Sequence, residues 1–369
     1  MTPKFWRRAN WAAAQSLEEL ILQEVDVFEA FLDGGPPTLQ TLLLRGCRVG
    51  WSRIPSSPHL TTLHLHYPTN CGTSQVLLRY LRTVPLLENL ELAYALLDGE
   101  RTNHHDRVLL PRLQHLLVEG MLDVEVLNFF GGITIPSTAK ISANMDGEED
   151  GNTTPIESLT ALQNCRSTSM PWDPTVLVIT VTQLELMFDI YEDAKGEQSL
   201  PILHFIFNDP GAGAVVESSC TLFNLTNLTL LDINIFPAIH AIPPTLWSNT
   251  FGQLPNLRTL KVRGDTCTSF VKHLFDEGNT IYNHDGQPPS LSFPVLEVLA
   301  LAGWDRSAWH PNPLISALKT RIDLGHRLQE LILFVAGDHN CAGEDEEIPC
   351  KIKFRDLADT VEELLHNQL

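Results

Sequence analysis

Apolar residues recur along the chain in a fixed pattern, in which one apolar position is followed three and five positions later by two more. We number each copy from its first apolar residue, so that columns one, four and six are apolar. Eleven copies begin at Leu17, Leu39, Leu60, Leu87, Leu113, Val181, Leu200, Leu225, Leu257, Leu296 and Leu328. A short unit of this kind cannot bury its apolar side alone, and the pattern therefore predicts units that stack on their neighbours.

Each copy predicts one β-strand, because columns four and six alternate with the columns between them and so share one buried face. Columns three, five and seven then point the other way. Glycine occupies column eight in four copies, as Gly46, Gly120, Gly264 and Gly303. A glycine directly after a strand is typical of a turn with positive φ, where a Cβ would clash.

The segments between the strands favour helices. Apolar residues at 77, 80, 81 and 84 follow helical spacing, with Ser74 placed to cap the start. Segments 271–275 and 314–322 have the same spacing. A last amphipathic helix is expected over 354–369, where Leu357, Val361, Leu364 and Leu365 fall on one face. Strand, turn and helix in repetition predict an α/β fold.

The boundaries follow from where the pattern weakens. We expect one irregular solenoid domain over 1–369, with a parallel strand stack and intervening helices. Residues 1–16 are predicted to cap the first copy. Residues 131–215 break the period and form an irregular middle, in which Ile135–Ala143 is the best candidate strand.

The pattern resembles leucine-rich repeats, and Leu39-x-x-Leu42-x-Leu44-x-x-Cys47 matches the cysteine form of that motif. The resemblance covers nearly the whole chain, although column nine of most other copies lacks asparagine or cysteine, which makes the array irregular. Long, uneven repeats with phrases such as Leu254–Leu260 are similar to the C-terminal repeats of fungal F-box proteins. That resemblance implies a substrate receptor for ubiquitin ligation, with ligase components as further partners. No F-box is visible before Leu17.

Composition narrows the choice of partner and compartment. The formal net charge is −20 at pH 7, which disfavours nucleic acid and anionic membrane as partners. The seven cysteines have no CxxC spacing, so they predict neither a zinc site nor a thioredoxin-like motif, and their scatter along the chain fits a reducing compartment. Neither a signal peptide nor an apolar run of roughly 20 residues is visible. Cytoplasm or nucleus is the expected location.

Motifs for catalysis are not found: the chain has no GxSxG, HExxH or EF-hand loop, and it is predicted not to be an enzyme. His64 and His66 share one strand face, which metal binding could use. Because no carboxylate or thiol accompanies them at ligand spacing in the sequence, they are interpreted as part of a binding surface. No metal and no cofactor are predicted.

The polar columns of the strands supply the candidate site. They mix basic, acidic, histidine and apolar side chains, whereas a sheet face that meets only water is normally polar. This mixture favours a protein partner with apolar anchors inside a polar rim. The candidate partner-binding residues are Leu43, Arg45, His64, His66, Glu91, His115, Glu119, His204, Lys261, Arg263 and Phe334.

Three alternatives to this interpretation remain. Long loops could cover the apolar members of the face, such as Leu43 and Phe334. An enzyme could place its active site in the irregular middle, since long insertions in a scaffold often carry function. The chain could also be a degraded, non-functional copy.

Overall fold

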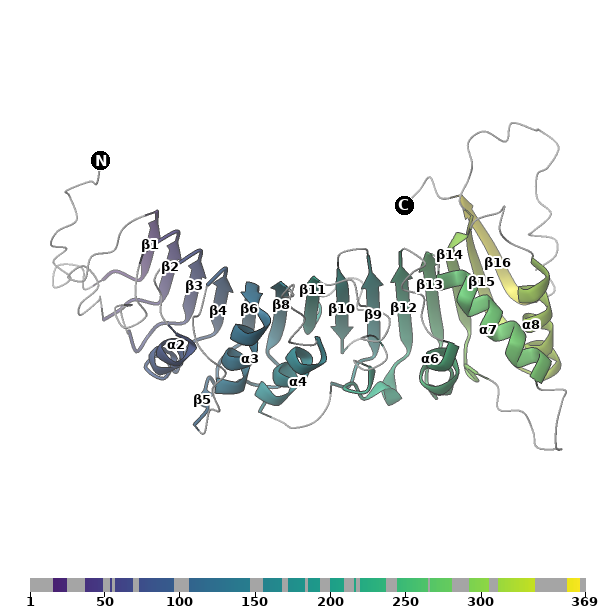
Figure 1. Ribbon diagram of the computed structural model, residues 1–369, viewed down its shortest axis with the longest axis horizontal. Helices are drawn as coiled ribbons and strands as arrows, with labels where there is room; N and C mark the ends of the chain where they lie inside the picture. The colour runs from purple at the N-terminus through teal and green to yellow at the C-terminus, as the bar shows by residue number, and fades with distance from the viewer. Residues whose placement is uncertain are drawn as a thin grey trace. The chain divides into compact units, whose positions relative to one another are not determined.

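The computed structural model describes most of the repeat copies. The described residues are 16–24, 37–48, 54, 57–68, 73–95, 106–146, 155–167, 172–182, 185–192, 200–208, 216, 220–236, 244–264, 266–280, 292–304, 311–335 and 357–365. The predicted N-terminal cap, 1–16, lies almost entirely outside them. The chain is mixed α/β, with mostly parallel strands (Figure 1). It divides into two compact units, residues 1–171 with 202–208, and residues 172–201 with 209–369. The prediction of a single domain stays a prediction.

Unit 1 contains seven parallel strands in the order β1, β2, β3, β4, β6, β8 and β11. These strands are β1 Glu19–Gln23, β2 Thr41–Arg45, β3 Thr62–His66, β4 Asn89–Ala93, β6 His115–Leu122, β8 Lys140–Asp146 and β11 Leu203–Asn208. A second, two-stranded sheet pairs β5 Val108–Leu109 with β7 Ile133–Thr134. The helices are α2 Ser74–Leu81, α3 Asp123–Gly132 and α4 Pro155–Cys165.

Unit 2 has the strand order β10, β9, β12, β13, β14, β15 and β16. These strands are β9 Val176–Val181, β10 Leu186–Tyr191, β12 Leu230–Ile235, β13 Thr259–Gly264, β14 Val298–Trp304, β15 Leu328–Val335 and β16 Ala358–Leu365. All neighbours are parallel except β9 and β10. Its helices are η5 Leu225–Asn227, α6 Pro244–Asn249, η7 Phe251–Gln253, α7 Thr266–Thr280 and α8 Pro311–Asp323.

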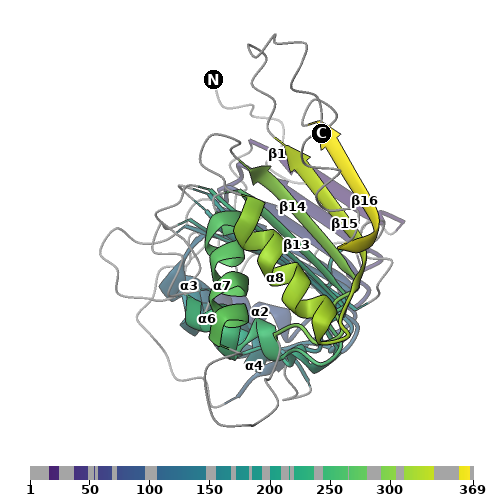
Figure 2. The ribbon, with the colours of Figure 1, turned by 90° about the vertical axis from the view of Figure 1, so that its right-hand side faces the viewer.

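The predicted alternation is confirmed strand by strand. In β2 and β3 the leucines at columns four and six are fully buried, whereas columns three and five are half-buried. Equivalent leucines pair across the sheet, as Leu42 does with Leu63. In Figure 2 the labelled helices lie along one side of the strands, and α3 and α7 contact the strands of their own units. The core of each unit therefore lies between its helices and columns four and six.

Column eight forms a repeated backbone turn. Gly46, Gly120 and Gly264 have positive φ, as predicted, and so do Glu24, Tyr67 and Tyr94 at the same column. In unit 1 the column-eight N–H donates to a carbonyl at the end of the next strand; Tyr67 donates to Ala93 over 2.8 Å. Gly303 lies where the register between β14 and β15 shifts, and Gly120 lies at the same kind of shift between β6 and β8. The turn conformation thus belongs to the column, and several non-glycine residues adopt it.

The predicted C-terminal helix over 354–369 is wrong. Residues Ala358–Leu365 form strand β16, which pairs in parallel with β15, and Val361 lies opposite Leu331. The helical spacing of the apolar residues is also compatible with a strand. Pairing in the sheet satisfies the backbone groups along the edge of β15, which a separate helix would leave unpaired.

Two copies and two smaller predictions also need correction. Val181 ends β9 and does not begin a copy, because the Thr182 N–H donates to the Glu185 carbonyl and the next strand, β10, pairs with β9 in antiparallel fashion. The copy assigned to Leu225 begins at Leu228, since the next buried residues, Leu231 and Ile233, are in register with β13. The candidate strand 135–143 starts later, as β8. Thr73, not Ser74, is the N-cap of α2, and its side chain makes no capping hydrogen bond.

Candidate functional site

The candidate site in unit 1 is the face of β2, β3, β4 and β6 that carries columns three, five and seven. We call it the unit 1 strand face, and it comprises Thr41, Leu43, Arg45, Thr62, His64, His66, Asn89, Glu91, Ala93, His115, Leu117 and Glu119. Arg45 and His115 are exposed, Ala93 is buried and the others are half-buried. These strands pair in parallel with no register shift up to column seven. Residues of the same column in neighbouring copies therefore lie side by side.

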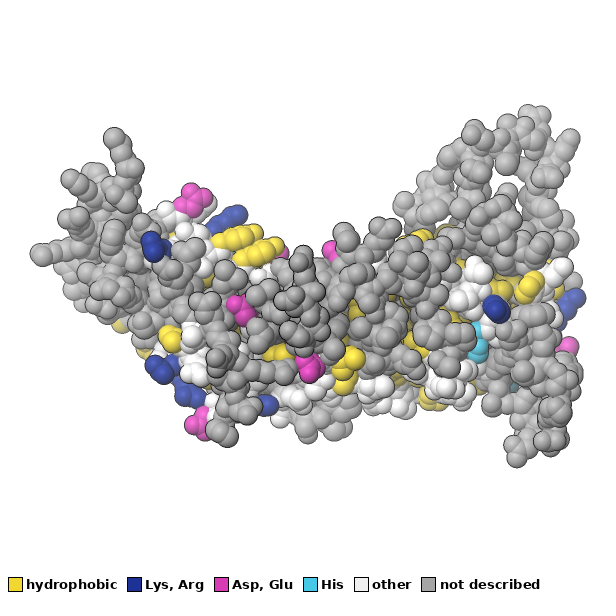
Figure 3. Space-filling view, viewed as in Figure 1, with side chains coloured by type: hydrophobic (Ala, Val, Ile, Leu, Met, Phe, Trp, Pro, Cys, Tyr) yellow, Lys and Arg dark blue, Asp and Glu magenta, His cyan; other side chains and the backbone are white. Residues whose placement is uncertain are grey.

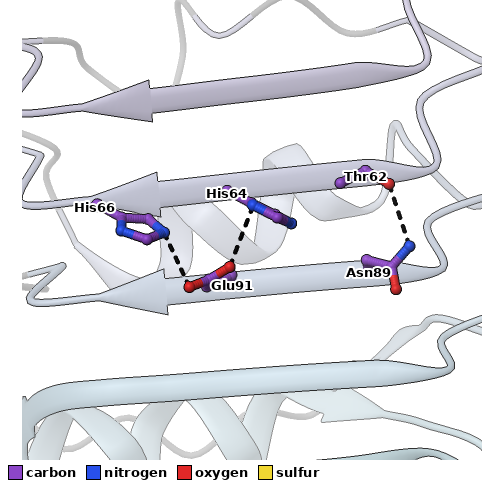
Figure 4. A network of polar contacts seen from close by, with 5 residues as sticks. All are labelled: Thr62, His64, His66, Asn89 and Glu91. Carbon is purple, nitrogen blue, oxygen red and sulfur yellow. Dashed lines mark hydrogen bonds and ion pairs between the residues drawn. The ribbon is translucent and has the colours of Figure 1, made fainter. Parts of the chain in front are cut away.

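A histidine–carboxylate cluster lies at the centre of this face (Figure 4). His64 Nδ1 is 3.2 Å from Glu91 Oε2, and His66 Nε2 is 3.0 Å from Glu91 Oε1. The two imidazole rings lie side by side, with centroids 6.3 Å apart and 27° between their planes. Strand geometry explains this arrangement, because residues two apart point to the same side and Glu91 is in register with His64. The sequence-based conclusion that no carboxylate accompanies these histidines is therefore wrong.

The cluster has an apolar flank on each side. Leu43 of β2 is in register with His64, and Leu117 of β6 is in register with Glu91. Within the described part of the chain, His64 and His66 are the only polar side chains that contact Glu91. At the other end of β3 and β4, Asn89 donates a hydrogen bond of 3.2 Å to the Thr62 hydroxyl. The middle of the face thus carries a paired polar group framed by aliphatic side chains.

Three polar side chains at the margin of the face have no polar partner in the part of the chain that the structure describes. Arg45, in register with His66, makes no ion pair with any described residue. The side chains of His115 and Glu119 likewise have no polar partner among the described residues. Arg45 and Glu119 carry opposite charges on either side of the cluster, so this margin offers both a donor and an acceptor to another molecule.

Two tyrosines next to the face were not predicted as site residues. Tyr67 and Tyr94 follow β3 and β4, are exposed, and stack with ring centroids 4.5 Å apart and 7° between their planes. A Cβ on Gly120 would lie 2.3 Å from the Tyr94 ring, so that ring covers the glycine. Figure 3 shows hydrophobic, basic and acidic side chains beside one another near the arrowhead ends of β1 to β4. The signal available in the sequence was that column eight holds tyrosine where other copies hold glycine.

The remaining predicted residues are not part of this cluster. His204 lies on β11, which β8 separates from β6 in the sheet order of unit 1. Lys261, Arg263 and Phe334 lie in unit 2, on β13 and β15, and are half-buried. Arg263 forms an ion pair of 2.8 Å with Asp232 of β12. Leu43 and Phe334 are half-buried, so the described residues leave part of each side chain uncovered.

The irregular middle shows one group with a shifted pKa among its described residues. Burial raises the pKa of the Cys165 thiol to about 12, and nearby Arg107 and Arg166 lower it only in part. The thiol donates to the carbonyl of Leu162 over 3.0 Å. A nucleophilic cysteine needs a lowered pKa and access to substrate, and Cys165 has neither. It is a buried structural thiol, as are Cys47, Cys220 and Cys267.

The chain matches no protein-family model, no curated protein and no solved structure in the three comparisons made. Among the described residues, no helix is long and apolar enough to cross a lipid bilayer. Interpretation of the site therefore depends on its own geometry.

Proposed function

We propose that the protein is a non-enzymatic recognition module that binds another protein on the strand faces of a leucine-rich-repeat-like solenoid. By the resemblance of its repeats, its context is substrate selection for ubiquitin ligation, in the cytoplasm or nucleus. Neither nucleic acid nor membrane is a partner in this proposal, since the chain has a net charge of −20.

The observation that carries the proposal is the composition and exposure of the unit 1 strand face. At its margin Arg45 and Glu119 have no ion-pair partner among the described residues, and the aliphatic side chains beside its central cluster, Leu43 and Leu117, are only half-buried. Protein interfaces combine apolar contact with a polar rim in this way. The adjacent Tyr67–Tyr94 stack adds exposed aromatic area, and tyrosine is enriched among the residues that dominate binding energy.

Unit 2 offers a second strand face with a different charge distribution. Lys261 and Arg263 are both basic, but Arg263 is already paired with the largely buried Asp232. Replacing Arg263 would therefore disturb that pair as well as any contact with a partner. Lys261, which also interacts with other residues, is a second position for a charge reversal in this unit.

The experiment that tests the proposal is affinity capture from a lysate of the native source, comparing the wild-type chain with two variants. The face variant carries Arg45→Glu and Glu119→Lys, which leave the net charge unchanged. The control carries Arg79→Glu, an exposed arginine on helix α2 away from the strand face. We expect one set of proteins to be recovered by the wild type and the control and lost with the face variant.

A recovered set that is the same for all three proteins would refute the face assignment. Lys261→Glu, with Lys319→Glu on helix α8 as its control, applies the same comparison to unit 2. Cullin-ligase components in the set would support the ubiquitin-ligase context. Their absence from a set that still depends on the face would leave recognition standing and remove that context.

A further inference from the structure

We propose that His64, His66 and Glu91 form a binding site for one divalent transition-metal ion, with Zn²⁺ as its best-fitting member. The three side chains offer two imidazole nitrogens and a carboxylate oxygen, which all lie within 4.8 Å of one another. The same set of ligand types, two histidines and one glutamate, holds zinc where a fourth position is left open. The inference concerns unit 1 alone and does not depend on the proposed protein partner.

The distances within the cluster suit such an ion. Zinc bonds to nitrogen and carboxylate oxygen are about 2.0–2.2 Å long, so two ligands of a tetrahedral zinc lie about 3.3 Å apart. The two nitrogen–oxygen separations are 3.2 and 3.0 Å. These two contacts use different oxygens of Glu91, and the three ligand atoms lie within 4.8 Å of one another, so the cluster has to tighten around the ion. Because both imidazole rings lie at a partly exposed surface, rotation of their side chains can bring the ring nitrogens together.

The state of His66 adds a separate observation. Its Nε2 atom is almost inaccessible to solvent and has no hydrogen-bond partner, although Glu91 Oε1 lies at ion-pair distance. The contact therefore has the separation of an ion pair without the direction of a hydrogen bond. A nitrogen that is withdrawn from water and poorly used as a donor is available as a ligand once its proton is displaced.

The ligand types select the metal. Imidazole nitrogen suits zinc, copper, nickel and iron, whereas calcium and magnesium are held by oxygen ligands. One carboxylate and two imidazoles do not supply the oxygen-rich shell that Ca²⁺ or Mg²⁺ requires. The partly exposed surface leaves the remaining coordination positions of the ion to water. The net charge of −20 favours cation binding in general, while Arg45 beside His66 opposes it locally.

A different role for the same geometry is a cross-strand ion pair that only fastens β3 to β4. The two roles predict different metal binding. A metal site binds one equivalent of Zn²⁺ and then saturates, whereas a structural ion pair gives no such saturable binding. They also differ in which variants matter. Glu91→Gln keeps hydrogen-bonding capacity toward both histidines, whereas a metal ion loses an anionic ligand.

The test is titration of the full chain, without a histidine tag, with ZnCl₂ by calorimetry and with CoCl₂ by visible absorption. The variants are Glu91→Gln and His66→Gln, and the matched controls on the same face are Glu119→Gln and His115→Gln. We expect one tight equivalent in the wild type and both controls. Mutation of a residue that only orients a metal ligand typically lowers metal affinity by roughly 10–100-fold. Each cluster variant loses a ligand itself, so its Zn²⁺ affinity should fall by at least this much. Ca²⁺ and Mg²⁺ should not compete.

Equal Zn²⁺ affinity in the cluster variants and the wild type would overturn the proposal, and so would the absence of a tight equivalent. Footprinting of the wild type guards against a variant that fails to fold. Diethyl pyrocarbonate modifies accessible imidazole nitrogens, and mass spectrometry reads each site. One equivalent of Zn²⁺ should protect His64 and leave His115 reactive. Protection of both, or of neither, would mean that zinc binds elsewhere or only adventitiously.

Discussion

Two glycines of unit 2 separate two costs of placing a side chain in the repeat turn: the cost of a positive φ and the cost of a steric clash with a neighbouring copy. Gly264, at column eight after β13, has φ +72, and Gly325, after helix α8, has φ +86. An added Cβ at Gly264 would lie 2.3 Å from the backbone carbonyl oxygen of Ile235, whereas nothing lies within 4 Å at Gly325. Replacing each glycine by alanine therefore imposes the same unfavourable φ but only one clash.

The expected sizes follow from these surroundings. A Cβ in the left-handed region costs about 1–2 kcal/mol. The lower entropy of the unfolded chain with alanine returns about 0.4–1 kcal/mol. Gly325→Ala should therefore lower the free energy of unfolding by about 1 kcal/mol. Gly264→Ala adds an overpacking cost of about 1–3 kcal/mol, because a backbone carbonyl in a paired strand cannot swing away. Its total loss should be about 2–4 kcal/mol.

The assay is urea unfolding followed by circular dichroism, with both variants and the wild type at one protein concentration. Gly46→Ala provides a second comparison at column eight, since its Cβ would approach Glu24 Cγ only to 3.4 Å. It should resemble Gly325→Ala. If Gly264→Ala costs no more than Gly325→Ala, the tight approach of neighbouring copies at column eight is wrong, and the stacking of units built on it fails.

Two further predictions concern the buried thiol and the last strand. Burial raises the pKa of the Cys165 thiol from 9.0 to about 12. The thiol of the unfolded chain therefore loses its proton at lower pH than the thiol of the folded chain. The free energy of unfolding should fall as pH rises between about 9 and 12, by up to about 1.4 kcal/mol per pH unit. Urea midpoints at pH 8 and 10.5 should show this fall, and the fall should be smaller in Cys165→Ala. An equal fall in the variant would mean that other groups cause it, such as Tyr80, whose pKa is also raised by burial. In β16, Val361→Ala should lower stability by about 1 kcal/mol, because alanine is a poor strand former. A gain in stability, which a helix would give, would contradict the strand.

Sequence periodicity was sufficient for the elements that repeat. Columns four and six located nine of the strands, since a buried face must alternate with an exposed one and the chain offers few other ways to bury leucine. It failed where two spacings fit the same residues. Leu225 and Leu228 both begin an acceptable run, and only pairing with β13 decides between them. The apolar residues of 357–365 satisfy a helix and a strand, and the open edge of β15 decides.

The candidate site was predictable residue by residue but not as a cluster. Column five of two neighbouring copies holds His64 and Glu91, and column seven holds His66, so the sequence contains all three. Their proximity depends on the parallel pairing of β3 with β4. This pairing joins residues far apart in the sequence; Thr62 and Asn89, in the same two strands, are 27 positions apart. Comparing columns between copies, rather than spacing within one copy, was the signal that could have shown the carboxylate beside the histidines.

Site-specific photocrosslinking can show whether the unit 1 strand face binds a protein partner. A photoreactive amino acid replaces Leu43 on the strand face in one protein and Arg79 on helix α2 in another. In lysate of the native source, the protein labelled at position 43 should crosslink to a defined protein, and the one labelled at position 79 should not. Crosslinking only from position 79, or equally from both, would contradict the claim.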